Sequence, residues 1–437
     1  MRRFLVRFVG RGQILVLAIL LAGCSGFGGS AAPQSTSNIV GHNTPTIQSN
    51  PTKVVSISSA TDTLAAQVLM NMHLHAWNPA AMTRGVVTGG LFINWEMNDP
   101  ARTNAVRPGP DGNPLHNHDP QVDLLYLMAQ AEYHQIHPGD HTFDTDLDHI
   151  TTLVLADFRS YSLPKGWIYF YLLRSGLMLH NSQLIDEAHA VAINFYNHWY
   201  DSQLGAVYDR AHTPGDYSTN HSLQCGAALI DAGQRWNQPE WISAGENAIE
   251  HVISAGLDPN YHLFYNSMII SNSGRDEVQN YQAKPSTQGE AVDALVTAYT
   301  LVHRQQYLDV AGQVLQSLLV TSGLWDKDHG GFSFALDMSS GKLFTNYKET
   351  RSQTLSLIGL NNYNQVGKRQ FASQEQQLIS VIINHFYEGT YHGFFYRVTP
   401  DFHVYMSRPG AGIGVENYFT TEAMGSALDA LQRTELS

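Results

Sequence analysis

The chain has 437 residues and a formal net charge of −13, with 14% charged and 11% aromatic residues. Four of its 25 basic residues lie within the first 11 positions, so the rest of the chain carries 21 basic against 38 acidic residues. This acidic balance excludes nucleic acids and anionic membrane surfaces as expected partners. The low charged fraction and the many aromatic residues instead suit neutral polyhydroxyl ligands.

The N-terminus predicts an exported lipoprotein. The apolar run Ile14–Leu21 is too short to remain as a helix across a bilayer of about 30 Å, and Leu21-Ala22-Gly23-Cys24 resembles the lipobox of bacterial lipoproteins. We expect residues 1–23 to be a signal peptide, Cys24 to carry lipid and the body to stand at the outer face of a bacterial membrane. An uncleaved membrane anchor is the alternative. Only Cys225 would remain besides Cys24, so no internal disulfide is expected.

Residues 24–53 are rich in Gly, Ser, Thr, Pro and Asn, which predicts a flexible tether. We expect residues 54–437 to form one domain, although their number exceeds the usual single-domain size.

Twelve stretches of this domain predict helices of two kinds. Six have apolar residues at three- and four-residue spacing opposite a polar stripe, which is typical of helices that face water: Leu64–Ala76, Asp146–Phe158, Leu184–Trp199, Trp241–Ala255, Tyr307–Leu319 and Gln374–Phe386. Each is followed by a stretch rich in Ala, Leu, Gly and Ser that would bury both faces: Asp119–Glu132, Gly166–Leu179, Asn220–Ala232, Gln288–Val302, Arg351–Asn362 and Thr421–Gln432. No such pair can bury its own apolar face, so the pattern predicts an all-α closed ring of six helical hairpins, an (α/α)6 toroid.

A Gly- and aromatic-rich element recurs between an outer helix and the next inner one. Its copies are Leu204–Tyr208, His262–Tyr265, His329–Phe334 and His392–Tyr396. Alternating aromatics bounded by Gly, Asn and Asp predict short strands at one rim of the ring.

We expect the function to reside where the six inner helices begin, because their unpaired N–H groups and positive dipole ends would meet around one funnel. At the first start, Asp119 and Asp123 are separated by about one turn and are expected on the same face. The alternative for Asp119 is an ordinary N-cap before Pro120. His116 and His118 also lie here, but no second cluster has ligand spacing, so no metal and no cofactor are expected.

The second and third starts offer Trp167, an aromatic plane for a sugar ring, and His221, which could move a proton near neutral pH. The alternatives are a core aromatic and a merely hydrogen-bonded histidine. At the fourth start, Glu290 is the leading acid, but it is also spaced from Thr287 as in a capping box.

The fifth and sixth starts carry further charges. Thr350 and Gln353 also have capping-box spacing, which leaves three charged residues that could line the site or neutralise one another: Lys348, Glu349 and Arg351. Glu422 at the sixth start is a secondary candidate, with a favourable first-turn charge as the alternative.

One segment resembles a known family. Leu324-Trp325-Asp326-Lys327-Asp328-His329-Gly330-Gly331-Phe332, together with Gln353–Leu360, is similar to the corresponding stretch of N-acylglucosamine 2-epimerase-type proteins. These belong to the wider six-hairpin (α/α)6 group, which includes many glycoside hydrolases, so the resemblance implies this fold. It also implies paired histidines at inner-helix starts, of which the chain offers His221 but none at Thr420-Thr421-Glu422. The adjacent Asp-Asp pair expected of the bacterial endo-mannanase branch is absent, since Asp119 and Asp123 are separated.

The leading hypothesis is a glycoside hydrolase that acts on an extracellular oligo- or polysaccharide. Glu290 would be the acid and Asp119 the base, with Glu349 as a substitute for either and Asp123 and His221 as further candidates; an inverting pair would be about 6.5–9.5 Å apart. The candidate sugar-binding residues are Trp167, Trp325, Tyr347, Lys348, Arg351, Gln288 and Glu422.

Two alternatives stay open. A sugar epimerase or polysaccharide lyase would use His221, Tyr347 or Lys348 to abstract a proton, and a non-catalytic lipoprotein would only bind carbohydrate. We expect a monomer whose partners are a carbohydrate and, through Cys24, a membrane.

Overall fold

The computed structural model describes residues 57–83, 85–96, 118–159, 163–209, 215–271, 273–367, 369–405 and 418–436. All of them belong to one compact unit, Val55–Ser437. The expected signal peptide, Cys24, the tether and His116 lie outside the described residues. Within the described part, no helix combines the length and apolar character needed to cross a membrane.

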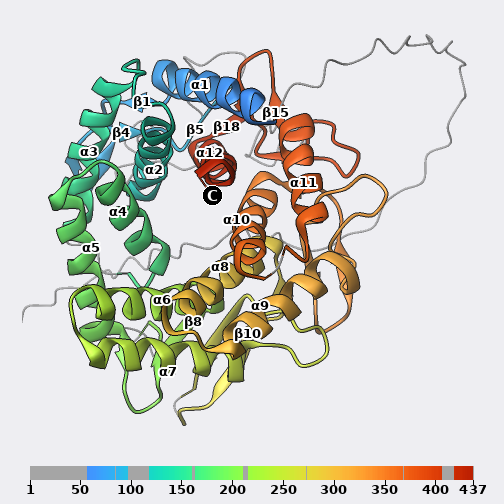
Figure 1. Cartoon of the computed structure of the whole chain (residues 1–437). Coiled ribbons are helices and arrows are strands. Elements are labelled where there is room, and N and C mark those ends of the chain that lie inside the picture. The colour runs from blue at the N-terminus through green and yellow to red at the C-terminus, as the bar shows by residue number, and fades with distance from the viewer. Residues whose placement is uncertain are drawn as a thin grey trace, which may run out of the picture. The chain divides into compact units, whose positions relative to one another are not determined.

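Six helices form a closed inner ring, as the alternation of helix types predicted. They are α2 (Pro120–Ile136), α4 (Gly166–Met178), α6 (Thr219–Arg235), α8 (Pro285–Val302), α10 (Thr350–Val366) and α12 (Thr421–Leu436). Each packs against the next, and α12 packs against α2, so the ring closes (Figure 1). This closure confirms the toroid.

Six further helices surround the ring. They are α1 (Ile57–His75), α3 (Asp144–Phe158), α5 (Ser182–Asn194), α7 (Pro239–Gly256), α9 (Gln305–Gln316) and α11 (Ala372–Val381). Three of them continue into π-helical turns, namely η2 (Phe195–Trp199), η3 (Ser317–Thr321) and η4 (Ile382–Phe386). Each outer helix packs mainly against the inner helix that precedes it, and α1 packs mainly against α12. The tight hairpins are therefore inner-to-outer, and the long connections run from an outer helix to the next inner one.

Small residues let the inner helices approach closely, as the composition predicted. A Cβ on Gly289 would lie 2.3 Å from the carbonyl oxygen of Leu355 on the neighbouring helix, and a Cβ on Gly359 would lie 2.4 Å from the carbonyl oxygen of Gly289. Any side chain at these positions would push α8 and α10 apart.

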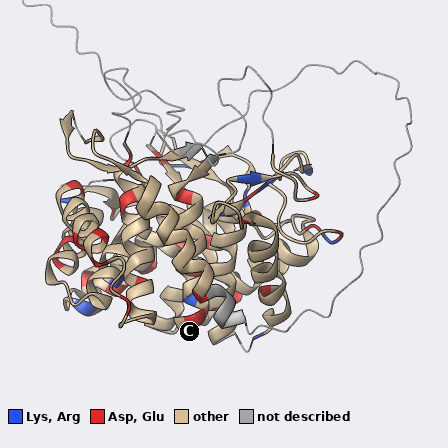
Figure 2. Cartoon of the chain, turned by 90° about the horizontal axis from the view of Figure 1, so that it is seen from above, with Lys and Arg blue, Asp and Glu red and all other residues tan. Residues whose placement is uncertain are grey.

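Short strands occupy the long connections, at the end of the ring where the inner helices begin. They are β1 (Trp77–Asn78), β2 (Met82–Thr83), β3 (Val86–Val87), β4 (Gly90–Leu91), β5 (Asn94–Glu96), β6 (Tyr200–Asp201), β7 (Ala206–Val207), β8 (Gly215–Ser218), β9 (Ser267–Ile270), β10 (Asp276–Asn280), β11 (Gln282–Ala283), β12 (Ala335–Asp337), β13 (Lys342–Phe344), β14 (Lys348–Glu349), β15 (Tyr387–Glu388), β16 (Gly393–Phe394), β17 (Arg397–Val398) and β18 (Tyr418–Thr420). In the edge-on view of Figure 2 the strands gather along one edge, while the carboxyl end of α12 lies at the opposite edge. The rim of β elements is therefore confirmed.

The recurring aromatic element is a repeated turn. Its antiparallel bridges join residues seven apart, in the pairs Tyr200–Val207, Leu257–Phe264, Trp325–Phe332 and Tyr387–Phe394. A residue with positive φ precedes the second bridge partner by two positions in each copy: Gly205, His262, Gly330 and His392. The turn lets the chain leave an outer helix and fold back onto the next inner one.

Inner-helix side chains hold these turns through buried hydrogen bonds. The Gln288 side chain bonds both backbone groups of Phe264, accepting from N and donating to O at 2.8 Å each. Gln353 likewise bonds Phe332, at 2.7 and 3.0 Å. Both glutamines lie four residues after the N-cap of their helix. We call this position the clamp position.

Candidate functional site

Polar and charged side chains from the starts of all six inner helices meet at the strand-bearing end of the ring. Helix periodicity places residues two, six, nine and thirteen after the N-cap on one face of each inner helix, and contacts between these residues on different helices indicate that this face points to the ring axis. The group nearest the helix starts, here called the amino-end cluster, is Asp119, Gln121, Lys165, Asn220, His221, Glu290, Arg351 and Glu422.

Glu290 on α8 is the most buried carboxylate of this cluster, with 8% of its surface exposed. Its Oε2 accepts a hydrogen bond of 2.7 Å from Asn220 Nδ2 and lies 3.9 Å from Arg351 Nη2. Burial raises the pKa of Glu290 above its ordinary value, although Arg351 and Asn220 oppose this shift. Glu290 therefore keeps its proton to a higher pH than a free glutamate.

The capping-box alternative for Glu290 is wrong. Helix α8 begins at Pro285 with Lys284 as its N-cap, so Thr287 lies inside the helix and its hydroxyl donates instead to Asn266 Oδ1. The Glu290 side chain therefore does not cap the helix and contacts Asn220 of the neighbouring helix α6 instead.

Arg351 joins two carboxylates at the start of α10. Its Nη1 lies 3.0 Å from Glu422 Oε1, and both side chains are partly exposed, at 40% and 38%. Burial opposes the charge of Arg351, but Glu422, Glu290 and Glu349 outweigh burial and raise its pKa. Solvent therefore reaches the cluster at Arg351. The Arg351 guanidinium is permanently charged.

Lys165 is the second cation of the cluster. Its Nζ donates to Gln121 Oε1 at 2.7 Å. Burial lowers the pKa of Lys165, and the positive charge of Arg351 lowers it further. The carboxylates of Asp119, Glu290 and Glu422 raise it. Three carboxylates thus lie within electrostatic reach of one ammonium group.

Asp119 is the N-cap of α2, so the ordinary role weighed for it is present. Its Oδ1 accepts from the backbone N and from the side-chain Nε2 of Gln121, both at 3.0 Å. Asp119 is half-buried. In this capping position it contacts Gln121, whose side-chain oxygen accepts the hydrogen bond from Lys165.

His221 and Trp167 complete the predicted residues at this end. Burial lowers the pKa of His221 well below its ordinary value, and Lys165 and Arg351 add to the effect, so the imidazole is neutral at pH 7. Trp167 lies two residues after the N-cap of α4, the same position as Gln121, Asn220 and Arg351, and packs edge-to-face on Tyr171 at 5.3 Å.

A second set of charges lies on the same helix faces, nine and thirteen positions after the N-cap. These charges close the ring axis below the cluster. It comprises Glu132, Arg174, Asp293, Asp429 and Arg433 and is called the floor network here. Arg174 Nη2 lies 2.7 Å from Glu132 Oε1, and Arg433 pairs with Asp429. The axis is therefore filled by an ion network at this level.

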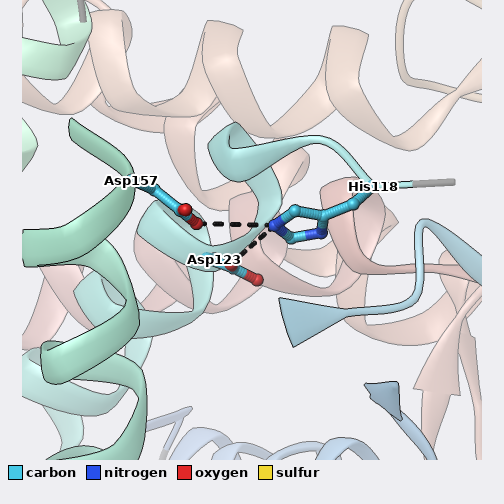
Figure 3. Close-up of side chains that lie close together, drawn as sticks. All are labelled: His118, Asp123 and Asp157. Atoms are coloured by element: carbon cyan, nitrogen blue, oxygen red, sulfur yellow. Dashed lines mark hydrogen bonds and ion pairs between the residues drawn. The ribbon is translucent and has the colours of Figure 1, made fainter. Parts of the chain in front are cut away.

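Two predicted residues lie at the clamp position and outside the cluster. Gln288 is fully buried and holds Phe264. Asp123 is also fully buried, and its Oδ1 accepts from Leu91 N at 2.9 Å. The expectation that Asp119 and Asp123 enter the mouth together is wrong, because the Asp123 carboxylate faces His118 and the outer helix α3 (Figure 3).

Other predicted residues belong to the rim. Lys348 is 1% exposed, and its Nζ donates to Gly330 O and Pro400 O and pairs with Asp326. Glu349 is held by Arg397 at 2.6 Å. Glu349 also acts on Arg351 at longer range, but the direct ion pairs of Lys348, Glu349 and Arg351 are with Asp326, Arg397 and Glu422, so the three do not form one mutually neutralising cluster.

The two rim aromatics are also accounted for by packing. Tyr347 contacts the Arg397 guanidinium at 4.3 Å, Phe334 and Tyr405, and Trp325 packs on Phe332 in the repeated turn. The capping box of Thr350 is absent too, because Gln353 is the clamp of its helix.

Gln121, Lys165 and Asn220 are cluster residues that the sequence did not single out. All three lie at the N-cap or two positions after it, as do Trp167 and Arg351. Aligning the six helix starts on their N-caps would have found them.

The fold is shared with carbohydrate-active enzymes of known structure. The chain is similar to an unsaturated glucuronyl hydrolase specific for heparin, with a TM-score of 0.63 at 13% identity over 87% of this chain and 97% of that one. It is similar to an inactive variant of the family 76 α-1,6-mannanase of a Salegentibacter species in complex with α-1,6-mannotetrose, with a TM-score of 0.61 at 9% identity over 86% and 99%. It is also similar to the cellobiose 2-epimerase of Bacillus thermoamylovorans, with a TM-score of 0.61 at 10% identity over 86% and 100%.

No protein-family model and no curated protein matches the sequence. At these low identities the similarity establishes the six-hairpin (α/α)6 fold, which confirms the predicted fold group.

Proposed function

We propose that the protein is a glycoside hydrolase that cleaves an oligo- or polysaccharide in the amino-end cluster, with Glu290 as general acid. The observation that carries this proposal is the setting of Glu290, a nearly buried carboxyl whose pKa is raised by burial and which nevertheless adjoins the partly exposed Arg351 and Glu422. A carboxyl that keeps its proton can protonate the leaving oxygen of an acetal.

Asp119 is the proposed base that activates water. Asp119 is half-buried, and its charge and that of Glu290 both raise the pKa of Lys165, which indicates that the two carboxylates lie near the same ammonium group. Glu422 is a weaker candidate because Arg351 pairs with it directly at 3.0 Å. Glu349, the substitute considered from the sequence, is engaged by the fork of Arg397, at 2.9 Å from Nε and 2.6 Å from Nη2.

Trp167 supplies a sugar-stacking surface in this proposal. Asn220, Gln121, Lys165 and Arg351 supply donors for hydroxyl groups. The comparisons support carbohydrate as the ligand, since the fold neighbours include hydrolases and an epimerase of sugars.

The test begins with a glycan panel and the purified full-length protein. A rise in melting temperature identifies a glycan that binds, and new reducing ends are then measured with that glycan. Glu290→Gln should lower the rate by about 100- to 10,000-fold, the usual contribution of a general acid. Glu240→Gln is the matched control, because Glu240 is exposed at the start of α7. A glycan that binds tightly without cleavage would point to a non-catalytic binder.

A sugar epimerase is the second candidate, because the neutral imidazole of His221 lies in the same cluster and could abstract a proton. His221→Ala separates the two functions. A hydrolase that depends on Glu290 should retain substantial rate in this variant, whereas an epimerase that depends on His221 should lose nearly all of it.

We further propose export and lipid attachment at Cys24, on the basis of Leu21-Ala22-Gly23-Cys24 alone. Cells given labelled palmitate should label the protein, and Cys24→Ala should abolish the labelling. Equal labelling of both would contradict the proposal.

A further inference from the structure

Three side chains outside the amino-end cluster meet in a dry site between α2 and α3 (Figure 3). His118 lies just before α2, Asp123 in the first turns of α2 and Asp157 at the end of α3. Their side chains are 0%, 0% and 1% exposed. His118 Nε2 lies 3.1 Å from Asp123 Oδ2 and 3.5 Å from Asp157 Oδ2.

One nitrogen faces two carboxylate oxygens, so one proton cannot satisfy both. His118 Nε2 has hydrogen-bond geometry with Asp157 Oδ2. Asp123 Oδ2 is buried, points at the same nitrogen and has no hydrogen-bond partner among the described residues. A buried carboxylate oxygen without a donor is costly, which indicates that another group belongs between these atoms.

The separations fit a shared metal ion. Neighbouring ligand atoms about 2.0–2.2 Å from one zinc ion lie about 3.3–3.6 Å from one another in a tetrahedral arrangement and about 2.8–3.1 Å in an octahedral one. The two nitrogen–oxygen distances in the site, 3.1 and 3.5 Å, lie within the span of these two arrangements.

The charges also favour a dication. Within the described part of the chain, His118 is the basic side chain that contacts these two carboxylates. A protonated imidazole would neutralise one of the two buried negative charges and leave the other unpaired. A divalent ion bound to a neutral imidazole would neutralise both, as buried charges require.

The surroundings hold the ligand atoms in place. Leu91 N donates to Asp123 Oδ1 at 2.9 Å, which turns Oδ2 towards His118. Gly90 makes room for the imidazole, because a Cβ there would lie 2.3 Å from His118 Cε1. Such outer contacts are typical supports of metal ligands.

We propose that His118 Nε2, Asp123 Oδ2 and Asp157 Oδ2 bind one divalent transition-metal ion, with Zn²⁺ or Mn²⁺ as the best fit to one nitrogen and two oxygen donors. The ion joins the outer helix α3 to the start of α2, next to Asp119. At least one further coordination position remains for another ligand. The sequence alone did not predict this site, because Asp157 lies 34 positions beyond Asp123 on another helix.

The test uses the full-length protein purified without chelator, then dialysed against Zn²⁺, Mn²⁺ or Ca²⁺. Mass spectrometry of the metals should find about one Zn²⁺ or Mn²⁺ per chain, and excess metal should raise the melting temperature reversibly with EDTA. Asp157→Asn should lower the metal affinity on the order of 100-fold or more, since loss of a supporting contact alone costs 10- to 100-fold. Asp276→Asn, which removes the carboxylate charge 3.1 Å from His251 in another His–Asp pair, is the control and should keep the metal.

Wild-type protein loaded with Co²⁺ provides a measurement that needs no variant, because nitrogen and oxygen ligands in a low-symmetry site give visible absorption bands. Failure of the wild type to retain any of these ions, with no change in melting temperature, would overturn the proposal. So would equal metal content in Asp157→Asn, or binding of Ca²⁺ in preference to all transition metals.

Discussion

Glu290 and Glu349 lie at neighbouring inner-helix starts, and their surroundings separate their roles. Glu290 is desolvated and accepts a 2.7 Å hydrogen bond from the Asn220 amide, with a guanidinium at 3.9 Å. Glu349 lies between the Nε and Nη2 atoms of Arg397, which itself stacks on Tyr347. The Glu349 carboxylate is occupied by these two charge-assisted hydrogen bonds, so the acid role falls to Glu290.

The pH dependence of the rate follows from this setting. A general acid works only while protonated, so the rate should fall as the pH rises through the raised pKa of Glu290. Arg351 lowers that pKa, and Arg351→Gln should therefore move the alkaline limb of the kcat profile to higher pH, whatever happens to KM. An unchanged limb, or a shift to lower pH, would show that another group titrates there. Arg304→Gln, on the outer surface, should leave the limb in place.

The candidate site could be predicted only in part from single residues. Asp119 and Asp123 were assigned to one face from their spacing, but Asp119 is an extended N-cap residue with φ −124° and ψ 109°. Helix periodicity does not orient a residue outside the helix. Asp123 is inside α2, and its direction is fixed by the clamp contact with Leu91, which no local spacing reveals.

At the scale of elements, the hairpin count and the amphipathic periods predicted all twelve helices, because burial repeats with the helical period on every outer helix. Among the inner helices the least accurate start was that of α8, which begins three residues before the predicted Gln288; among the outer helices it was that of α1, which begins at Ile57 and not at Leu64. Pro285 at the first helical turn was the local signal for the α8 start. The clamps were missed because nothing local marks a glutamine that bonds a distant turn: Gln353 was interpreted as a capping residue and Gln288 as a sugar-binding residue.

The clamps should contribute measurably to stability. Gln353→Ala leaves a buried N–H and a buried C=O of Phe332 without partners, at about 1–3 kcal/mol each, and should lower the free energy of unfolding by about 2–6 kcal/mol. Gln365→Ala on the same helix is the control, because Gln365 is exposed and bonds only within α10. Urea titration measures both. A loss below about 0.5 kcal/mol in Gln353→Ala would argue against the clamp.

At the scale of the whole molecule, the ring brings charges from distant helices together along one axis. The floor network contains three carboxylates, Glu132, Asp293 and Asp429, against the two guanidinium groups of Arg174 and Arg433. Burial and the neighbouring Asp429 raise the pKa of Glu132 well above its ordinary value of 4.5, despite Arg174 and Arg433. The network therefore favours retention of one proton.

This proton makes stability depend on pH. Above about pH 4.5 the unfolded chain releases the Glu132 proton while the folded chain keeps it, so stability falls as the pH rises, by at most about 1.4 kcal/mol per pH unit for one proton. Glu132→Gln cannot titrate and should become progressively more stable relative to the wild type from pH 5 to pH 8 in urea titrations. Glu240→Gln should show a constant difference. A Glu132→Gln difference that shrinks with rising pH would mean that the ionised form is the native one.

The central claim, that the amino-end cluster hydrolyses a glycosidic bond, is tested most directly by isotope labelling of a bound glycan. In water enriched in ¹⁸O, we predict that the wild type places ¹⁸O at each new reducing end, and that no carbon-bound deuterium is gained in D₂O. Deuterium on a sugar carbon of an uncleaved glycan would contradict hydrolysis and assign the cluster to epimerisation.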